Sequence, residues 1–206
     1  MTEQVAKNYP DKVAFKFKKD PRDKEAQSVT FSESRDFIRD LGTELHAIGI
    51  EGKKVAIVGV ASVEWFFSYV ALMSSGAVTV PIDKELPAAD IASIINTSAA
   101  EYIFFSASVY EKISEVKALC PSVSTLVSMG GECEGTTSLV SMRESGAKRY
   151  ADADDSYYTY EIDNEGLASI VFTSGTTGKG KGVMLTQKMI LSDIAEGLKY
   201  VSVSPK

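Results

Sequence analysis

The fold is decided by residues 55–82, which read "VAIVGVASVEWFFSYVALMSSGAVTVPI". The stretch opens with the β-branched run "VAIVGV" and closes with the similar run "VTVPI", and the interval between them suits one helix. Gly59 and Ser62 interrupt the apolar residues, and Glu64 lies among them, which disfavours a membrane-spanning helix. We therefore expect a buried strand, a turn, a helix and a second buried strand.

The same unit recurs further along the chain. Short apolar runs begin at Val55, Val78, Tyr102 and Thr125, so their starts are 23, 24 and 23 residues apart. The intervening residues do not resemble one another, which indicates a repeated architecture and no repeated sequence. Continuously apolar strands that alternate with helices predict a parallel sheet covered on both faces. Because such crossovers are right-handed, the predicted fold class is a doubly wound α/β layer.

The predicted helices follow from apolar spacing and from capping residues. The clearest stripe comprises Phe37, Leu41, Leu45 and Ile48, and the single histidine, His46, is predicted to lie beside it on the helix surface. Helices are expected to begin near Ser32, after Pro87, after a capping-box pattern at Ser108 and Glu111, near Ser138, and near Met189. The segments "KVAFKFK" and "SVTFS" near the N-terminus predict an antiparallel pair at the margin of the sheet.

Residues 130–165 are polar and rich in Gly, Ser, Asp and Tyr, which is typical of a surface connection. Within this connection "YYTYEID" is open to two interpretations, as part of the acyl or nucleotide pocket or as an edge strand. The predicted organisation is therefore a first α/β subdomain with its linker over residues 1–165. Residues 166–206 form the start of a second, truncated α/β subdomain, which begins with the strand "LASIVFTS".

Composition and charge exclude several classes of protein. The chain has 206 residues, of which 44% are hydrophobic and 24% charged, and its net charge is −6. This acidity disfavours nucleic acid and anionic membrane as partners. Cys120 and Cys133 have no metal-ligand or disulfide-framework spacing, and the N-terminus has no apolar signal core. We expect a cytoplasmic protein.

Residues 170–186, "IVFTSGTTGKGKGVMLT", indicate the chemistry. A buried strand is followed by hydroxyl side chains, by two lysines, Lys179 and Lys181, and by glycines that can turn backbone N–H groups toward an anion. The glycines are Gly175, Gly178, Gly180 and Gly182, and the hydroxyls are those of Thr173, Ser174, Thr176 and Thr177. The pattern predicts a phosphate-binding loop. A flexible hairpin with solubilising lysines is the structural alternative.

Two other classes of protein are alternatives for this chain. "GTTGKGK" also has the spacing of the Walker A motif of P-loop nucleotide hydrolases, from Gly175 to Lys181. That motif requires Ser or Thr after the lysine and an immediate helix, whereas Gly182 follows here and "VML" continues as a strand. A helix that begins at Lys181 would support the hydrolase, and a hairpin would refute it. A non-catalytic scaffold or interaction fragment is the second alternative.

The segment "FTSGTTGKGKG", Phe172–Gly182, resembles the phosphate loop of the adenylate-forming (AMP-binding) superfamily. The family pattern is aromatic-Thr-Ser-Gly-Ser/Thr-Thr-Gly-x-Pro-Lys-Gly, and this chain has Gly180 where proline is usual. "VTFSES" at Val29 and "LMSSGAVTVPID" at Leu72 resemble the first and second conserved cores of the same family. The resemblance covers nearly the whole chain and favours fatty-acyl-CoA ligases slightly over peptide-synthetase domains.

The resemblance implies an ATP-dependent acid–thiol ligase, an AMP-forming acyl-CoA synthetase. Such an enzyme converts a fatty or other carboxylic acid to an acyl-adenylate and then to acyl-CoA, with ATP, Mg²⁺ and coenzyme A. The implied nucleotide-binding residues are Thr173, Ser174, Gly175, Thr176, Thr177, Gly178 and Lys181. Thr176 is the implied magnesium ligand. It also shares the catalytic role with Lys181, which would neutralise phosphate charge as pyrophosphate leaves.

Other motifs of the family do not occur in this sequence, among them aromatic-Gly-x-Thr-Glu and Thr-Gly-Asp. The chain is therefore interpreted as an N-terminal fragment that is inactive alone. Its expected partners are a small-molecule carboxylic acid and ATP, without nucleic acid or an integral membrane segment. Self-association through the region after Glu165, or disorder at the C-terminus, is expected. Residues 173–182 are expected to be mobile without nucleotide.

Overall fold

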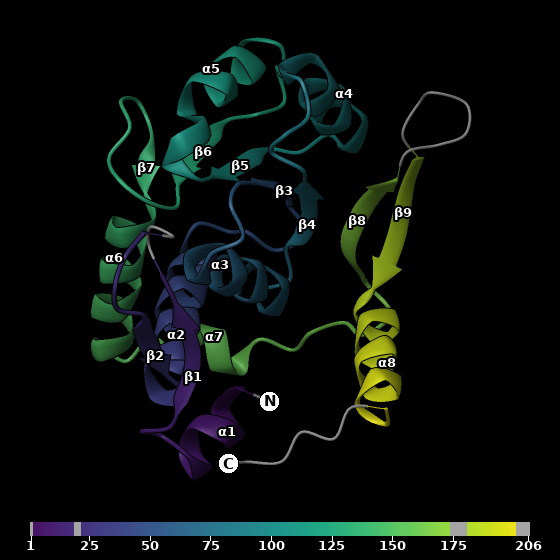
Figure 1. Cartoon of the computed structure of the whole chain (residues 1–206). Helices are drawn as coiled ribbons and strands as arrows, with labels where there is room; N and C mark the ends of the chain where they lie inside the picture. Colours follow the sequence, from purple (N-terminus) through teal and green to yellow (C-terminus); the bar gives the residue numbers. More distant parts are fainter. Residues whose placement is uncertain (1, 19–21, 174–180, 201–206) are drawn as a thin grey trace.

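The chain forms one seven-stranded sheet with helices on both faces and a second sheet of two strands (Figure 1). This computed structural model describes residues 2–18, 22–173 and 181–200. The large sheet has the order β7-β6-β5-β3-β4-β8-β9, and its neighbours are parallel except for β8 and β9. Its strands are β3 (Lys54–Val58), β4 (Val78–Ile82), β5 (Tyr102–Phe105), β6 (Thr125–Ser128), β7 (Thr137–Ser138), β8 (Leu167–Thr173) and β9 (Lys181–Thr186). The predicted α/β class is confirmed.

Helices cover the two faces of the sheet unequally. Helices α4 and α5 lie on one face, and α2, α3 and α6 lie on the other (Figure 1). The helices of the chain are α1 (Thr2–Asn8), α2 (Phe31–Ala47), α3 (Val63–Ser74), α4 (Ala88–Ser98), α5 (Tyr110–Ala118), α6 (Leu139–Ala151), α7 (Ser156–Thr159) and α8 (Gln187–Leu198). Alternate residues of β3 enter two separate cores, Val55 and Ile57 toward α2 and α3, and Ala56 and Val58 toward α4 and α5. Burial on both faces explains the continuously apolar strand sequence.

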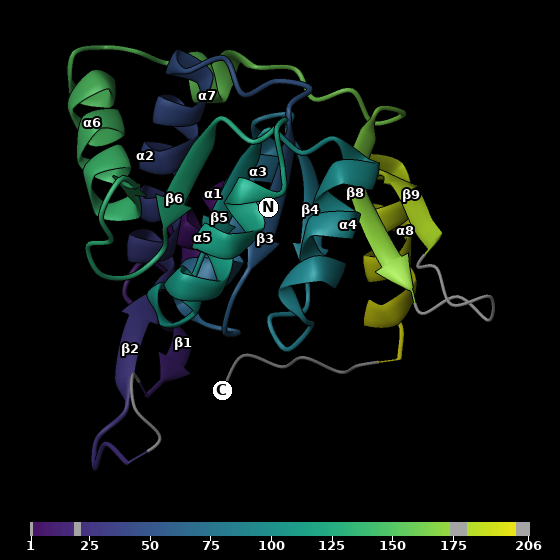
Figure 2. The same ribbon diagram turned by 90° about the horizontal axis from the view of Figure 1, so that it is seen from above.

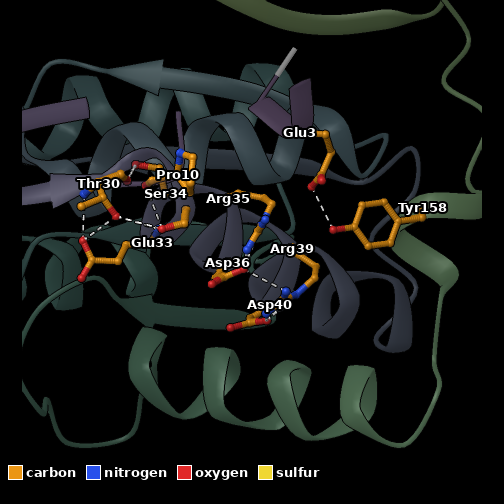
Figure 3. A network of polar contacts seen from close by, with 11 residues as sticks. Glu3, Pro10, Thr30, Glu33, Ser34, Arg35, Asp36, Arg39, Asp40 and Tyr158 are labelled. Carbon is orange, nitrogen blue, oxygen red and sulfur yellow. Dashed lines mark hydrogen bonds and ion pairs between the residues drawn. The ribbon is translucent and has the colours of Figure 1, made fainter. Parts of the chain in front are cut away.

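The cap of α2 is a complete capping box (Figure 3). The Glu33 amide donates to the Thr30 hydroxyl at 3.2 Å, and the Thr30 amide donates to the Glu33 carboxylate at 2.8 Å. The capping box predicted at Ser108 and Glu111 is wrong. Helix α5 is preceded by a 3₁₀ turn, Ala107–Val109, which places Ser108 inside the turn and leaves no side-chain cap.

The predicted N-terminal strand pair is present as β1 (Val13–Phe17) and β2 (Gln27–Thr30), which are antiparallel. Its predicted place at the margin of the main sheet is wrong, because the two strands form a sheet of their own. Phe15 packs against Phe66 and Phe67 of α3, with ring centroids 5.3 Å apart in both pairs. This small sheet therefore extends the core on the α3 side.

Residues 130–165 are more structured than the predicted surface connection. Helix α6 packs along α2 (Figure 2), and Leu139 and Met142 are buried between them. The contact depends on Gly146, where an added Cβ would lie 1.7 Å from the Asp40 carbonyl oxygen. The Arg143 guanidinium lies 3.9 Å from the centre of the Phe37 ring, and burial lowers the pKa of Arg143.

The segment "YYTYEID" begins in helix α7, so its edge-strand interpretation is wrong. Helix α7 packs against α2. The Tyr157 ring fills the space beside Gly42, and the Tyr158 hydroxyl donates to Glu3 of α1 at 2.9 Å (Figure 3). Burial raises the pKa of Tyr158, and the hydrogen bond to Glu3 acts in the same direction. These contacts tie the connection to both α1 and α2.

The prediction for His46 is also wrong. Its side chain is only 5% exposed, its Nδ1 contacts the Glu51 carboxylate, and its ring centre lies 4.9 Å from that of Tyr160. The connection after α6 covers this histidine, and helical spacing alone could not show that.

We expect Gly146→Ala to destabilise the protein by about 2 kcal/mol. Overpacking at the α2–α6 contact costs about 3 kcal/mol, and alanine regains about 1 kcal/mol of helix propensity. Urea unfolding measures the difference. Gly130→Ala is the matched control, since nothing lies within 4 Å of an added Cβ there, and we expect a change below about 0.5 kcal/mol. Equal effects of the two substitutions would contradict the tight helix contact.

Candidate functional site

The candidate site lies at the turn end of a hairpin made by β8 and β9, where the connecting loop leaves the two strands. The two strands are antiparallel, and the register runs from Leu167 opposite Thr186 to Thr173 opposite Lys181. The loop that joins Thr173 to Lys181 lies outside the described residues. It contains the predicted site residues Ser174, Gly175, Thr176, Thr177 and Gly178, together with Lys179 and Gly180. The structure thus places the two ends of the predicted loop opposite each other.

The hairpin refutes the P-loop hydrolase. Lys181 is the first residue of strand β9, whereas a Walker A lysine is followed at once by a helix. Helix α8 begins later, at Gln187, with the Thr186 hydroxyl accepting from the Met189 amide at 3.2 Å. The Walker spacing is therefore coincidental.

Close packing explains why residue 182 is a glycine, which the sequence alone did not indicate. It lies inside β9, opposite Phe172, and an added Cβ would be 2.9 Å from Cγ2 of Ile170 and 3.2 Å from Cζ of Phe172. The Phe172 ring thus occupies the space above this glycine. This close approach accounts for a glycine in a strand interior, where glycine is otherwise unfavourable.

The end of β8 lies at the edge of the sheet where ligands bind in open α/β folds. Strands β3, β4, β5, β6 and β8 are parallel, so their carboxyl ends lie on the same edge (Figure 2). At the end of β3 this edge is filled, because the Ser106 hydroxyl accepts from the Val60 amide at 3.0 Å and covers Gly59. The end of β8 has no such cover among the described residues.

The side chains at the mouth of the loop suit an anion. Thr173 and Lys181 are both exposed and, as a directly opposed pair, lie on one face of the hairpin. Within the described part of the chain Lys181 has no ion-pair partner. A free ammonium beside a hydroxyl matches the donors that bind a phosphate.

Three hollows elsewhere on the molecule fit a nucleotide less well. One of about 560 Å³ lies at the ends of β4 and β5, but the Lys112 ammonium there already donates to the carbonyls of Lys84 and Leu86, at 2.7 and 3.2 Å. Two smaller hollows lie beside Tyr160, away from the carboxyl edge. Among the residues that the structure describes, no cluster of His, Cys, Asp or Glu side chains could hold a metal ion.

Three polar residues near the site were missed at the level of sequence. Ser169 donates to the Thr79 carbonyl at 3.1 Å, Thr79 donates to the Ala168 carbonyl at 3.2 Å, and the Tyr69 hydroxyl lies 3.4 Å from that of Ser169. Ser169 and Thr79 are 90 residues apart in the sequence, so no local pattern connects them.

Comparison with known proteins identifies the class. The profile of the AMP-binding enzyme family matches residues 2–205, and the chain belongs to this family. A chloroplastic long-chain-fatty-acid acyl-carrier-protein ligase of Arabidopsis thaliana is 29% identical over 95% of the chain, and surfactin synthase subunit 1 of Bacillus subtilis is 27% identical over 98% of it. A long-chain-fatty-acid-CoA ligase of Archaeoglobus fulgidus superposes with a TM-score of 0.81 at 22% identity over 98% of the chain.

The chain spans only part of the length of each of these relatives. It spans 29% of the length of the Arabidopsis ligase, 5% of the surfactin synthase subunit and 39% of the Archaeoglobus structure. The match covers the N-terminal part of fatty acyl-CoA ligases. Within the described ranges no helix is both long enough and apolar enough to cross a membrane.

The hairpin register can be tested by crosslinking. We expect a Thr173→Cys/Lys181→Cys variant in a Cys133→Ser background to form an intramolecular disulfide readily under mild oxidation. Directly opposed residues lie about 4.5–5.5 Å apart, within the range of a disulfide. The control is Thr173→Cys/Val183→Cys, a diagonal pair about 7–8 Å apart, which should crosslink poorly. Mass spectrometry measures both, and preferential crosslinking of the diagonal pair would contradict the register.

Proposed function

We propose that this chain supplies the triphosphate-binding part of an AMP-forming carboxylate–CoA ligase. The observation that carries the proposal is the opposition of Thr173 and Lys181 at the carboxyl edge of the sheet, on either side of a loop rich in Gly, Ser and Thr. Membership of the AMP-binding enzyme family supports the same reaction class. ATP, a carboxylic acid and coenzyme A would be its substrates.

The residues fit a polyphosphate. Thr173 offers a hydroxyl and Lys181 an ammonium on one exposed face, without competing carboxylates among the described neighbours. The proposed remaining ligands are the hydroxyls and amides of Ser174, Gly175, Thr176, Thr177 and Gly178, with Thr176 also at the Mg²⁺ ion. Mg²⁺ prefers oxygen ligands and keeps several waters, so one hydroxyl suffices as a protein contact.

The proposed chemistry is attack of a carboxylate oxygen on the α-phosphorus of ATP with departure of pyrophosphate. The chain's own residues would orient the β- and γ-phosphates and neutralise the charge of the leaving group. This is catalysis by positioning and electrostatic stabilisation, which needs no nucleophile–base pair. Lys181 would act in this step, since its ammonium has no ion-pair partner among the residues that the structure describes.

The acyl substrate is proposed to be a fatty acid. The similar Arabidopsis and Archaeoglobus proteins are long-chain-fatty-acid ligases, which supports this class. A cytoplasmic location is proposed from the sequence, in agreement with two free cysteines, Cys120 and Cys133.

We expect the chain to bind MgATP with a dissociation constant on the order of millimolar, because two or three charge-assisted hydrogen bonds must offset the ordering of the loop. Lys181→Ala should weaken binding at least about fivefold, and Thr176→Ala should also weaken it. NMR titration of the β9 amides measures the affinity. Lys199→Ala, which removes the same charge from the residue that follows α8, is the control and should leave the affinity unchanged.

The same preparation should produce no pyrophosphate or acyl-CoA from MgATP, fatty acids and coenzyme A. Equal affinities of Lys181→Ala and Lys199→Ala would contradict the proposed site. Turnover that disappears in Lys181→Ala would contradict the proposal that the chain is incomplete as a catalyst.

We also propose that the chain self-associates through β9 and α8. Met184 is 64% exposed on the edge strand, and α8 buries none of its side chains among the described residues. The exposed apolar residues of α8 are Met189, Leu191, Ile194 and Leu198. Unpaired edges and apolar patches of this kind promote association.

Met184→Lys should therefore shift the chain toward the monomer in sedimentation velocity at high concentration. Val140→Lys is the control, since Val140 is 58% exposed on α6 and lies outside this surface. A monomeric parent protein, or equal effects of both substitutions, would refute association through β9 and α8.

A further inference from the structure

The joint between β4 and β8 is the contact that attaches the hairpin to the parallel sheet. Its register places Thr79 opposite Ser169. The Val78 amide donates to Lys53 on the β3 side at 2.8 Å, so the alternation of peptide groups turns the N–H of Thr79 and position 81 toward β8. Position 81 is proline, which has no N–H to donate. The backbone ladder to β8 is therefore short of one hydrogen bond just beyond Thr79.

Side-chain hydroxyls reinforce this short ladder. The Thr79 hydroxyl donates to the Ala168 carbonyl on β8, and the Ser169 hydroxyl donates to the Thr79 carbonyl on β4, at 3.2 and 3.1 Å. Both residues are 0% exposed. The contact is thus reciprocal and shielded from water, where a lost hydrogen bond leaves a buried carbonyl unsatisfied.

A tyrosine completes the arrangement from α3. The Tyr69 hydroxyl lies 3.4 Å from the Ser169 hydroxyl, and the Tyr69 ring stacks on Trp65 with centroids 5.4 Å apart. Beyond this point Val171 and Phe172 are only partly buried, and Thr173 is exposed. Ser169 is therefore the last fully buried polar anchor before the mouth of the loop.

We propose that Thr79 and Ser169 are positioning residues for nucleotide binding. Their reciprocal hydroxyl contact fixes β8 against β4, and through β8 it fixes Thr173 and its partner Lys181 at the carboxyl edge. This inference rests on the proposed function for its nucleotide, but the structural step can be tested without one. Neither residue touches the nucleotide, because both lie buried inside the sheet.

The first measurement is amide hydrogen exchange of Thr79→Val, an isosteric change that removes the hydroxyl. We expect the β8 amides from Ala168 to Phe172 to exchange about tenfold faster, while the β3 amides keep their protection. Ser169→Ala should give the same local pattern. The control is Thr43→Val, which removes an equally buried hydroxyl that donates to the backbone carbonyl of Arg39 on α2 at 3.0 Å.

The second measurement is MgATP affinity from the shifts of the β9 amides. Thr79→Val and Ser169→Ala should each weaken binding about fivefold, whereas Thr43→Val should leave it unchanged even when it lowers the melting temperature as much. A loss of affinity in Thr79→Val and Ser169→Ala, but not in Thr43→Val, would distinguish a positioning role from a general loss of stability.

The two measurements distinguish the two proposals. If the parent protein shows no MgATP-dependent shifts in β9, the proposed function fails, and hydrogen exchange still decides the hydroxyl contact. Unchanged β8 exchange in Thr79→Val, or acceleration spread equally over β3 and β8, would overturn the positioning role. Faster β8 exchange with unchanged MgATP affinity would show a structural contact only and would also overturn it.

Discussion

The chain of pairings from β4 through β8 to β9 is the constraint on which the site depends. A parallel strand ends at the carboxyl edge, and the antiparallel return places Lys181 opposite Thr173 at that edge. The phosphate loop is thereby held at both ends by backbone hydrogen bonds. A P-loop holds its anion at the start of a helix, where the helix dipole contributes. In the proposed site of this chain, lysine and hydroxyl side chains on a hairpin would take that place.

The carboxyl edge of the sheet is covered by side chains at the end of β3 and exposed at the end of β8. The end of β3 is filled by Ser106, which satisfies the Val60 amide and covers Gly59. The end of β8 carries the exposed Thr173 beyond a buried segment, Ala168–Ile170, and the exposed Lys181 of β9 lies opposite it. Rigid burial at one end of a strand and exposed donors at the other suit a loop that must hold a charged ligand.

Much of the fold could be predicted from the sequence, because strands buried on both faces produce continuous apolar runs. Val55 and Val78 begin such runs, and the structure pairs both strands in parallel. The prediction failed where a tertiary contact had no local signature. Gly146 allows α6 to approach α2 although the α6 sequence is polar, and His46 is buried by a segment from beyond α6. The mouth of the site was predicted from its motif, whereas Thr79 and Ser169 required the sheet order.

The most direct measurement is a crystal structure of the chain with Mg²⁺ and a non-hydrolysable ATP analogue. We predict that the β- and γ-phosphates lie at the mouth of the hairpin, with the Lys181 ammonium and the Thr173 hydroxyl within hydrogen-bonding distance of phosphate oxygens. Triphosphate bound beside Lys84 and Lys112, or away from the carboxyl edge, would contradict the assignment of the hairpin as the nucleotide site.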